Sequence, residues 1–166
     1  ISKVTKAMQE LKKVQDEVDL RESGQQKQKF LNQQIVDDTT KSEKERNDAA
    51  AAQYAIDAKN ITDRINAQQV VLDAINEETL AWIKLTKRKE ATKGVDNMLA
   101  KSYKKTTKEK IALREKEQKI FNELELEQLQ IADEFGKTKV AIKSKNLNLT
   151  TEFEEAAAAA EIEIAK

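Results

Sequence analysis

The sequence predicts an all-α protein made of long coiled-coil helices, in an elongated rod or bundle, and three observations lead to this prediction. The 166 residues include no proline and only three glycines, where a globular domain of this length has about eight prolines and about a dozen glycines. Charged residues make up 36% and aromatic residues 4%, which is too few large apolar side chains for a compact core. Apolar residues also recur every three or four positions, as on one face of a helix.

The first predicted element is an N-terminal coiled-coil helix over residues 1–38. Its apolar residues Val4, Met8, Leu11 and Val18 follow the helical spacing, and the spacing then fails near Gly24. A second apolar patch follows out of register, which predicts a stutter or an interruption of the helix. After this patch the chain is wholly polar from 37 to 48. This polar stretch contains Thr40 and Glu43, which fit a capping box that begins a new helix.

The second predicted element is a central helix over residues 39–93, which has the strongest heptad pattern in the chain. Apolar positions alternate by three and four residues from Ala51 to Trp82, which is typical of a coiled-coil seam. The apolar stripe is wider than a two-helix seam, and this favours three or more helices in contact. A basic last turn is followed by Gly94 and then Asp96, a possible helix stop and a capped restart. Gly94 is either a hairpin turn or a kink, because glycine inside a helix costs only about 1 kcal/mol.

The third predicted element is a basic-then-acidic C-terminal helix over residues 94–166, and all three elements are interpreted as one helical segment of a longer protein. Polar residues occupy several seam positions, and polar seam residues lower stability and fix register. We expect isoleucine at four of these positions, Gln68, Thr79, Gln128 and Thr138, to raise the melting temperature. The predicted seam residues are Ala51, Tyr54, Ala58, Ile61, Ile65, Leu72, Ile75, Trp82, Phe121, Leu124, Ile131, Phe135, Ile142 and Leu149.

The net charge of zero hides an uneven distribution. Residues 1–83 hold 12 basic and 15 acidic side chains, a net charge of −3. Residues 84–120, the basic block, hold 13 basic and 5 acidic side chains, a net charge of +8. Residues 121–166 hold 5 basic and 10 acidic side chains, a net charge of −5. We expect the basic block to pair with the acidic flanks, across a hairpin or between chains. An anionic partner is the alternative. The block lacks the arginines and stacking aromatics of specific nucleic-acid readers, so no specific nucleic acid is expected.

The residue types present argue against catalysis. The chain has no histidine and no cysteine, which removes the commonest general base, the thiol nucleophile and the usual zinc ligands. The three glycines stand apart and form no phosphate-binding loop. We therefore expect no enzyme activity, no cofactor and no metal. A transmembrane segment is not expected either, because Asp73, Glu77, Glu78 and Lys84 interrupt the most apolar stretch.

In composition and in its heptad pattern the sequence resembles a stretch of a phage tail tape measure protein. The features that carry this resemblance are the 51–82 seam, the polar seam over 121–159 and the alanine block at 156–160. The resemblance implies a non-enzymatic virion component in the phage tail, a parallel homotrimer that lies inside the tail tube and sets tail length. The chain also resembles the receptor-binding helical hairpins of bacteriocins, with Gly94 at the tip. It departs from them in favouring lysine and glutamine over alanine and arginine.

Overall fold

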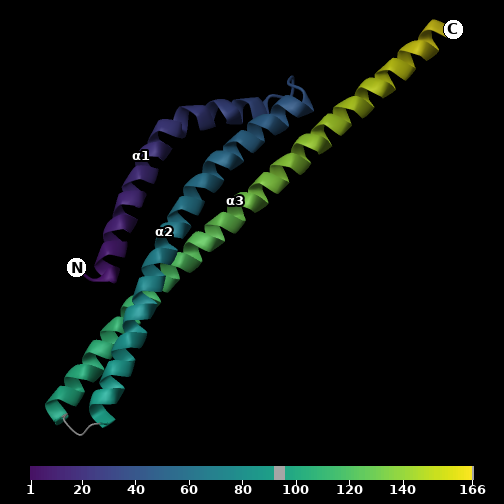
Figure 1. Ribbon diagram of the computed structural model, residues 1–166. Coiled ribbons are helices and arrows are strands. Elements are labelled where there is room, and N and C mark those ends of the chain that lie inside the picture. The colour runs from purple at the N-terminus through teal and green to yellow at the C-terminus, as the bar shows by residue number, and fades with distance from the viewer. Residues whose placement is uncertain (92–95, 166) are drawn as a thin grey trace. The chain divides into compact units, whose positions relative to one another are not determined.

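A computed structural model describes residues 1–91 and 96–165, apart from the side chains of 145–150, 161 and 163–165. In these ranges the chain forms α1 (Lys3–Asp37), α2 (Glu43–Ala91) and α3 (Asn97–Ala165), with no strand (Figure 1). The all-α prediction is therefore confirmed. The helices fall within the predicted segments 1–38, 39–93 and 94–166. Gly94, the predicted hinge, lies outside the described residues.

The beginning of α3 agrees with the predicted restart at Asp96. The beginning of α2 differs from the predicted capping box at Thr40 and Glu43. The Leu99 backbone N–H donates to Asp96 Oδ1 at 2.7 Å, so Asp96 is the N-cap of α3, as predicted. At α2 the cap is Ser42, whose hydroxyl accepts from the Glu45 N–H at 3.1 Å. Thr40 instead donates its N–H and its hydroxyl to Asp38 Oδ1, at 2.9 and 2.6 Å, in the α1–α2 turn.

The interruption predicted near Gly24 does not occur, because α1 continues as helix from Lys3 to Asp37. A Cβ atom built on Gly24 meets nothing within 4 Å, and the glycine is an exposed residue of α1. The change in apolar register therefore does not end the helix. Across the described ranges, no helix contains a run apolar and long enough to cross a bilayer.

The helices contribute to two compact units. Unit 1 contains residues 1–21 and 60–128, and unit 2 contains residues 22–59 and 129–166. Each unit therefore takes one piece from each of α1, α2 and α3.

In unit 1, α2 runs antiparallel to both α1 and α3. Lys3 pairs with Glu77 and Arg21 with Asp63, so residue numbers rise along α1 as they fall along α2. Between α2 and α3 the same reversal is seen, since Gln68 binds Glu117 and Trp82 binds Thr107. The core of this unit contains Ala7, Val71, Ala74 and Ile75, with Val4, Met8, Leu11 and Leu113 packed against it.

In unit 2, the end of α1 and the beginning of α2 pack against α3. The core contains Val36, Ala49, Ala50 and Ile142, with Ile35 and Phe135 beside it. Arg46, only 2% exposed, donates from Nε to the Val36 carbonyl oxygen at 2.9 Å. This buried hydrogen bond ties the first turn of α2 to the last turn of α1.

Candidate interaction surfaces

The predicted seam residues lie at different depths. Ile61, Leu72, Ile75 and Ile142 are buried; Tyr54, Ala58, Ile65, Trp82, Phe121, Leu124, Ile131 and Phe135 are half-buried; Ala51 is exposed. The side chain of Leu149 lies outside the described residues. The contacts of the seam run between helices of the same chain: Ile75 shares a core with Ala7 and Leu113, and Tyr54 stacks on Phe135 with ring centroids 4.6 Å apart.

The four polar seam positions differ in burial. Gln68 and Thr79 are buried, Thr138 is half-buried and Gln128 is exposed. Gln68 is 0% exposed, and its Nε2 donates to the Glu117 carboxylate at 2.7 Å and to the Glu117 carbonyl at 3.1 Å. This changes our expectation for Gln68, because isoleucine there would leave the buried Glu117 carboxylate without this donor.

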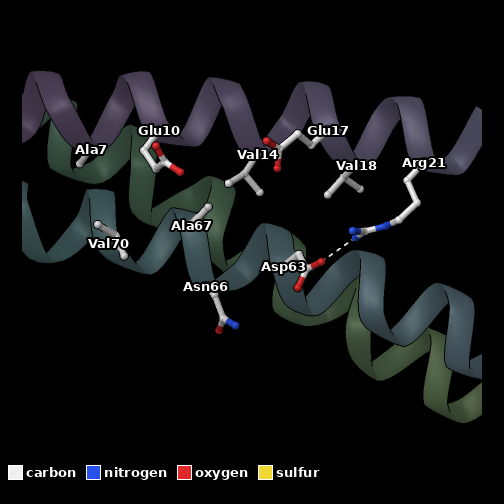
Figure 2. Close-up of a pocket in the computed structure, with 10 residues that line it drawn as sticks. All are labelled: Ala7, Glu10, Val14, Glu17, Val18, Arg21, Asp63, Asn66, Ala67 and Val70. Atoms are coloured by element: carbon white, nitrogen blue, oxygen red, sulfur yellow. Dashed lines mark hydrogen bonds and ion pairs between the residues drawn. The ribbon is translucent and has the colours of Figure 1, made fainter.

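A groove of about 300 Å³ lies between α1 and α2 in unit 1 (Figure 2). Its apolar wall includes Val14 and Val18 of α1 and Val70 of α2. At one end, Arg21 forms a 2.6 Å ion pair with Asp63, which Figure 2 marks as a dashed line. Glu10 and Glu17 also line the groove and are exposed. The groove thus offers apolar contact beside exposed carboxylates.

The aromatic cluster around Trp82 joins α2 to α3 in unit 1. The Trp82 indole meets Tyr103 edge-on at 5.6 Å, and its Nε1–H donates to Thr107 Oγ1 at 3.0 Å. Lys110 Nζ lies 5.6 Å from the indole centroid and 2.7 Å from a carboxylate oxygen of Glu78. Lys110 therefore pairs across the two antiparallel helices, as we expected of the basic block. Other lysines of the block, such as Lys84 and Lys104, are exposed.

Shifted pKa values occur away from these surfaces. Hydrogen bonds from the Thr40 hydroxyl and N–H lower the pKa of Asp38 below its ordinary 3.8. The ion pair with Asp133, at 2.9 Å, raises the pKa of Lys137 above 10.5. Within the described residues, no three or more aspartates or glutamates lie together in a way that could hold a metal ion.

Several contacts that hold the helices in register were not predicted. They join residues far apart in sequence: Arg21 binds Asn60 and Asp63, and Arg64 binds Asp19 at 2.8 Å. The sequence carries no signal for these pairs, because charged residues occur on every helix and only the register between helices selects partners.

Comparisons with protein-family models, with curated proteins and with solved structures find no match to this chain.

Proposed function

We propose that the protein is a non-enzymatic helical protein that works through contacts between its helical faces and other protein chains. Of the two resemblances, the receptor-binding helical hairpin has the better support. The observation that carries it is the antiparallel pairing of α2 and α3 through Trp82–Thr107 and Glu78–Lys110. A hairpin requires this pairing within one chain, whereas a parallel trimer directs its seam toward other chains.

The surface proposed to meet the receptor is the end of unit 1 where α2 ends and α3 begins. Lys87, Arg88, Lys101 and Lys105 are exposed there, and Met98 is 83% exposed. Cations around an exposed apolar side chain favour an acidic partner, since complementary charge steers association and selects partners. The proposed receptor is therefore a protein with an acidic face.

The second candidate is the tape measure, and one observation favours it. Helix α3 is continuous over 69 residues, and a helix rises 1.5 Å per residue, so chain length fixes physical length. In this proposal three chains associate through exposed faces inside the tail tube of the virion. The polar seam residues would weaken the bundle enough for later separation.

Sedimentation equilibrium at low protein concentration separates the two candidates. The hairpin proposal predicts the mass of one chain, 18.8 kDa. A stable mass of three chains that does not change on dilution would support the tape measure and overturn the hairpin. If the trimer is found, inserting one heptad into α3 and measuring the length of the assembly tests the ruler mechanism.

A further inference from the structure

The last part of α3 is an exposed helix surface. In unit 2 the contacts of α3 with α1 and α2 include Ile142, which packs on Val36 and Ala49. Every residue from 151 to 160 is exposed, and Phe153 is 75% exposed. Figure 1 shows α3 continuing past the beginning of α2 toward the C-terminus. This segment presents a helix surface to whatever lies outside the unit.

The surface of this segment has an ordered pattern. Phe153, Ala156, Ala157 and Ala160 are spaced as i, i+3, i+4 and i+7, so they form one apolar stripe along the helix. Glu152 and Glu154 lie on the two sides of the stripe, Glu155 lies on the opposite face, and residues 151–160 contain no lysine or arginine. The three alanines allow a close approach of another backbone. We call this surface the ridge: it consists of Phe153, with Glu152 and Glu154 on its two sides, and of the alanine run 156–160.

Unit 1 contains an open groove of complementary character between α2 and α3. One stretch of about 380 Å³ is lined by Leu80, Ile83, Ile111 and Arg114, among others. Leu80 is 58% exposed and Ile111 is 38% exposed. A neighbouring stretch of about 250 Å³ is lined by residues that include Thr86, Glu90, Lys104 and Lys108. The lining positions recur every three or four residues along both helices, so the two stretches follow one face.

Helix α1 does not cover this groove. Val4 of α1 lies at a small cavity formed with Ile75 and Glu78 of α2 and Leu113 of α3. The groove residues Asn76 and Arg114 stand one position after Ile75 and Leu113. A step of one residue turns the helix by about 100°. The groove therefore opens on a different face of the α2–α3 pair from the one that α1 occupies.

Charge selects this groove over the one in Figure 2. Lys84 and Lys87 follow Leu80 and Ile83 by one helical turn, and Lys104 and Lys108 line the groove from α3. These four lysines are exposed. The groove in Figure 2 instead carries exposed glutamates at 10 and 17, which would repel an acidic ridge.

We propose that residues 151–160 of one copy dock in the α2–α3 groove of a second copy, with the Phe153 stripe against Leu80 and Ile111. Ten residues of helix span about 15 Å, which is about the rise of α2 from Leu80 to Glu90. The two surfaces are different parts of the chain, so the contact is heterologous and lets further copies add. The inference rests on the proposed role in protein–protein contact and names a second copy as one partner.

The test is sedimentation velocity of the 166-residue chain over a series of concentrations at low and high salt. We expect the mean mass to rise with concentration, and to rise less at high salt because salt screens exposed charges. Glu152→Lys/Glu154→Lys changes the ridge, and Lys87→Glu/Lys104→Glu/Lys108→Glu changes the groove. Each variant alone is expected to associate at least about tenfold more weakly. An equal mixture of the two is expected to regain association, since one supplies an intact groove and the other an intact ridge.

The matched control is Lys6→Glu/Lys13→Glu/Lys27→Glu, which changes net charge as the groove variant does at exposed lysines elsewhere. It is expected to associate like the wild type, and equal weakening would overturn the groove assignment. A wild-type chain that stays monomeric, or a mixture that fails to associate, would overturn the proposal. If the groove variant has a lowered helix signal, Leu80→Ala takes its place, because Leu80 lines the groove and is 58% exposed. A monomeric chain would leave the receptor-binding proposal intact.

Discussion

Replacing Gln68 by leucine removes the amide that binds the buried carboxylate of Glu117. Gln68 on α2 is 0% exposed and Glu117 on α3 is 7% exposed. The amide donates to the carboxylate at 2.7 Å and to the Glu117 backbone carbonyl at 3.1 Å. Leucine has nearly the same size as glutamine but cannot donate a hydrogen bond. In Gln68→Leu the carboxylate therefore keeps its burial and loses this hydrogen bond.

The expected cost follows from these contacts. A hydrogen bond to a charged group contributes about 1.5–3 kcal/mol, and one to a carbonyl contributes about 1 kcal/mol. Burying the leucine side chain returns about 1.5 kcal/mol. Gln68→Leu should therefore lower the free energy of unfolding by about 1–2.5 kcal/mol. Gln68→Leu/Glu117→Leu removes both polar partners and should be close to the wild type or more stable.

Urea unfolding of the wild type, both single variants and the double variant gives the coupling free energy between the two residues. Circular dichroism at 222 nm follows both units, and the fluorescence of Trp82, the one tryptophan of the sequence, follows unit 1. Gln69→Leu is the matched control, since Gln69 is exposed, and should change stability by less than about 0.5 kcal/mol. Additive single effects, or a Gln68→Leu variant that is more stable than the wild type, would refute this reasoning.

Three further predictions concern other parts of the fold. Ile142→Ala should lower the free energy of unfolding by about 2–5 kcal/mol, because Ile142 is 1% exposed in the core of unit 2; Val140→Ala, at 69% exposure, should change it little in the same urea titration. Gly24→Ala and Gly136→Ala should each stabilise by about 0.5–1 kcal/mol, since both positions are helical with open space for a Cβ atom; a lower melting temperature in either would contradict this. The pKa of Asp38 is lowered by hydrogen bonds from Thr40, so its contribution to stability is complete above about pH 4 and is lost as pH falls through the folded-state value. The melting temperatures of the wild type and Asp38→Asn should therefore converge as the pH is lowered from about 5 to below 3. A difference in melting temperature that stays constant over this range would contradict the assigned role of Asp38.

The helices could be predicted from the sequence because their signals are local. The scarcity of breakers and the 51–82 seam indicate long helices, and the Asp96 cap depends on residues only three positions apart. Of the two alternatives at Gly24, a stutter or an interruption of the helix, the interruption is wrong, because α1 is helical from Lys3 to Asp37. Ion pairs with α2 lie on both sides of the glycine, Arg21–Asp63 and Lys29–Asp57, and α1 is helical between them.

The pairing of the helices could not be predicted, because it depends on register between segments far apart in the chain. Nothing local distinguishes Arg46, whose guanidinium is buried against the Val36 carbonyl, from the exposed cations around it. The burial of Gln68 also depends on Glu117, 49 residues away. The candidate interaction surfaces are formed by two helices packed together, so their position depends on this pairing. The sequence alone therefore indicated the charge of these surfaces but not which residues form them.

The most direct test of the antiparallel pairing within one chain is a cross-link between Glu78→Cys and Lys110→Cys. The chain has no cysteine of its own, and the two side chains meet at 2.7 Å in the wild type. A short bis-maleimide is added at low protein concentration, and the product is weighed by mass spectrometry. We predict an internal cross-link with the mass of one chain. A product with the mass of two chains, or no cross-link at all, would contradict the pairing of α2 with α3.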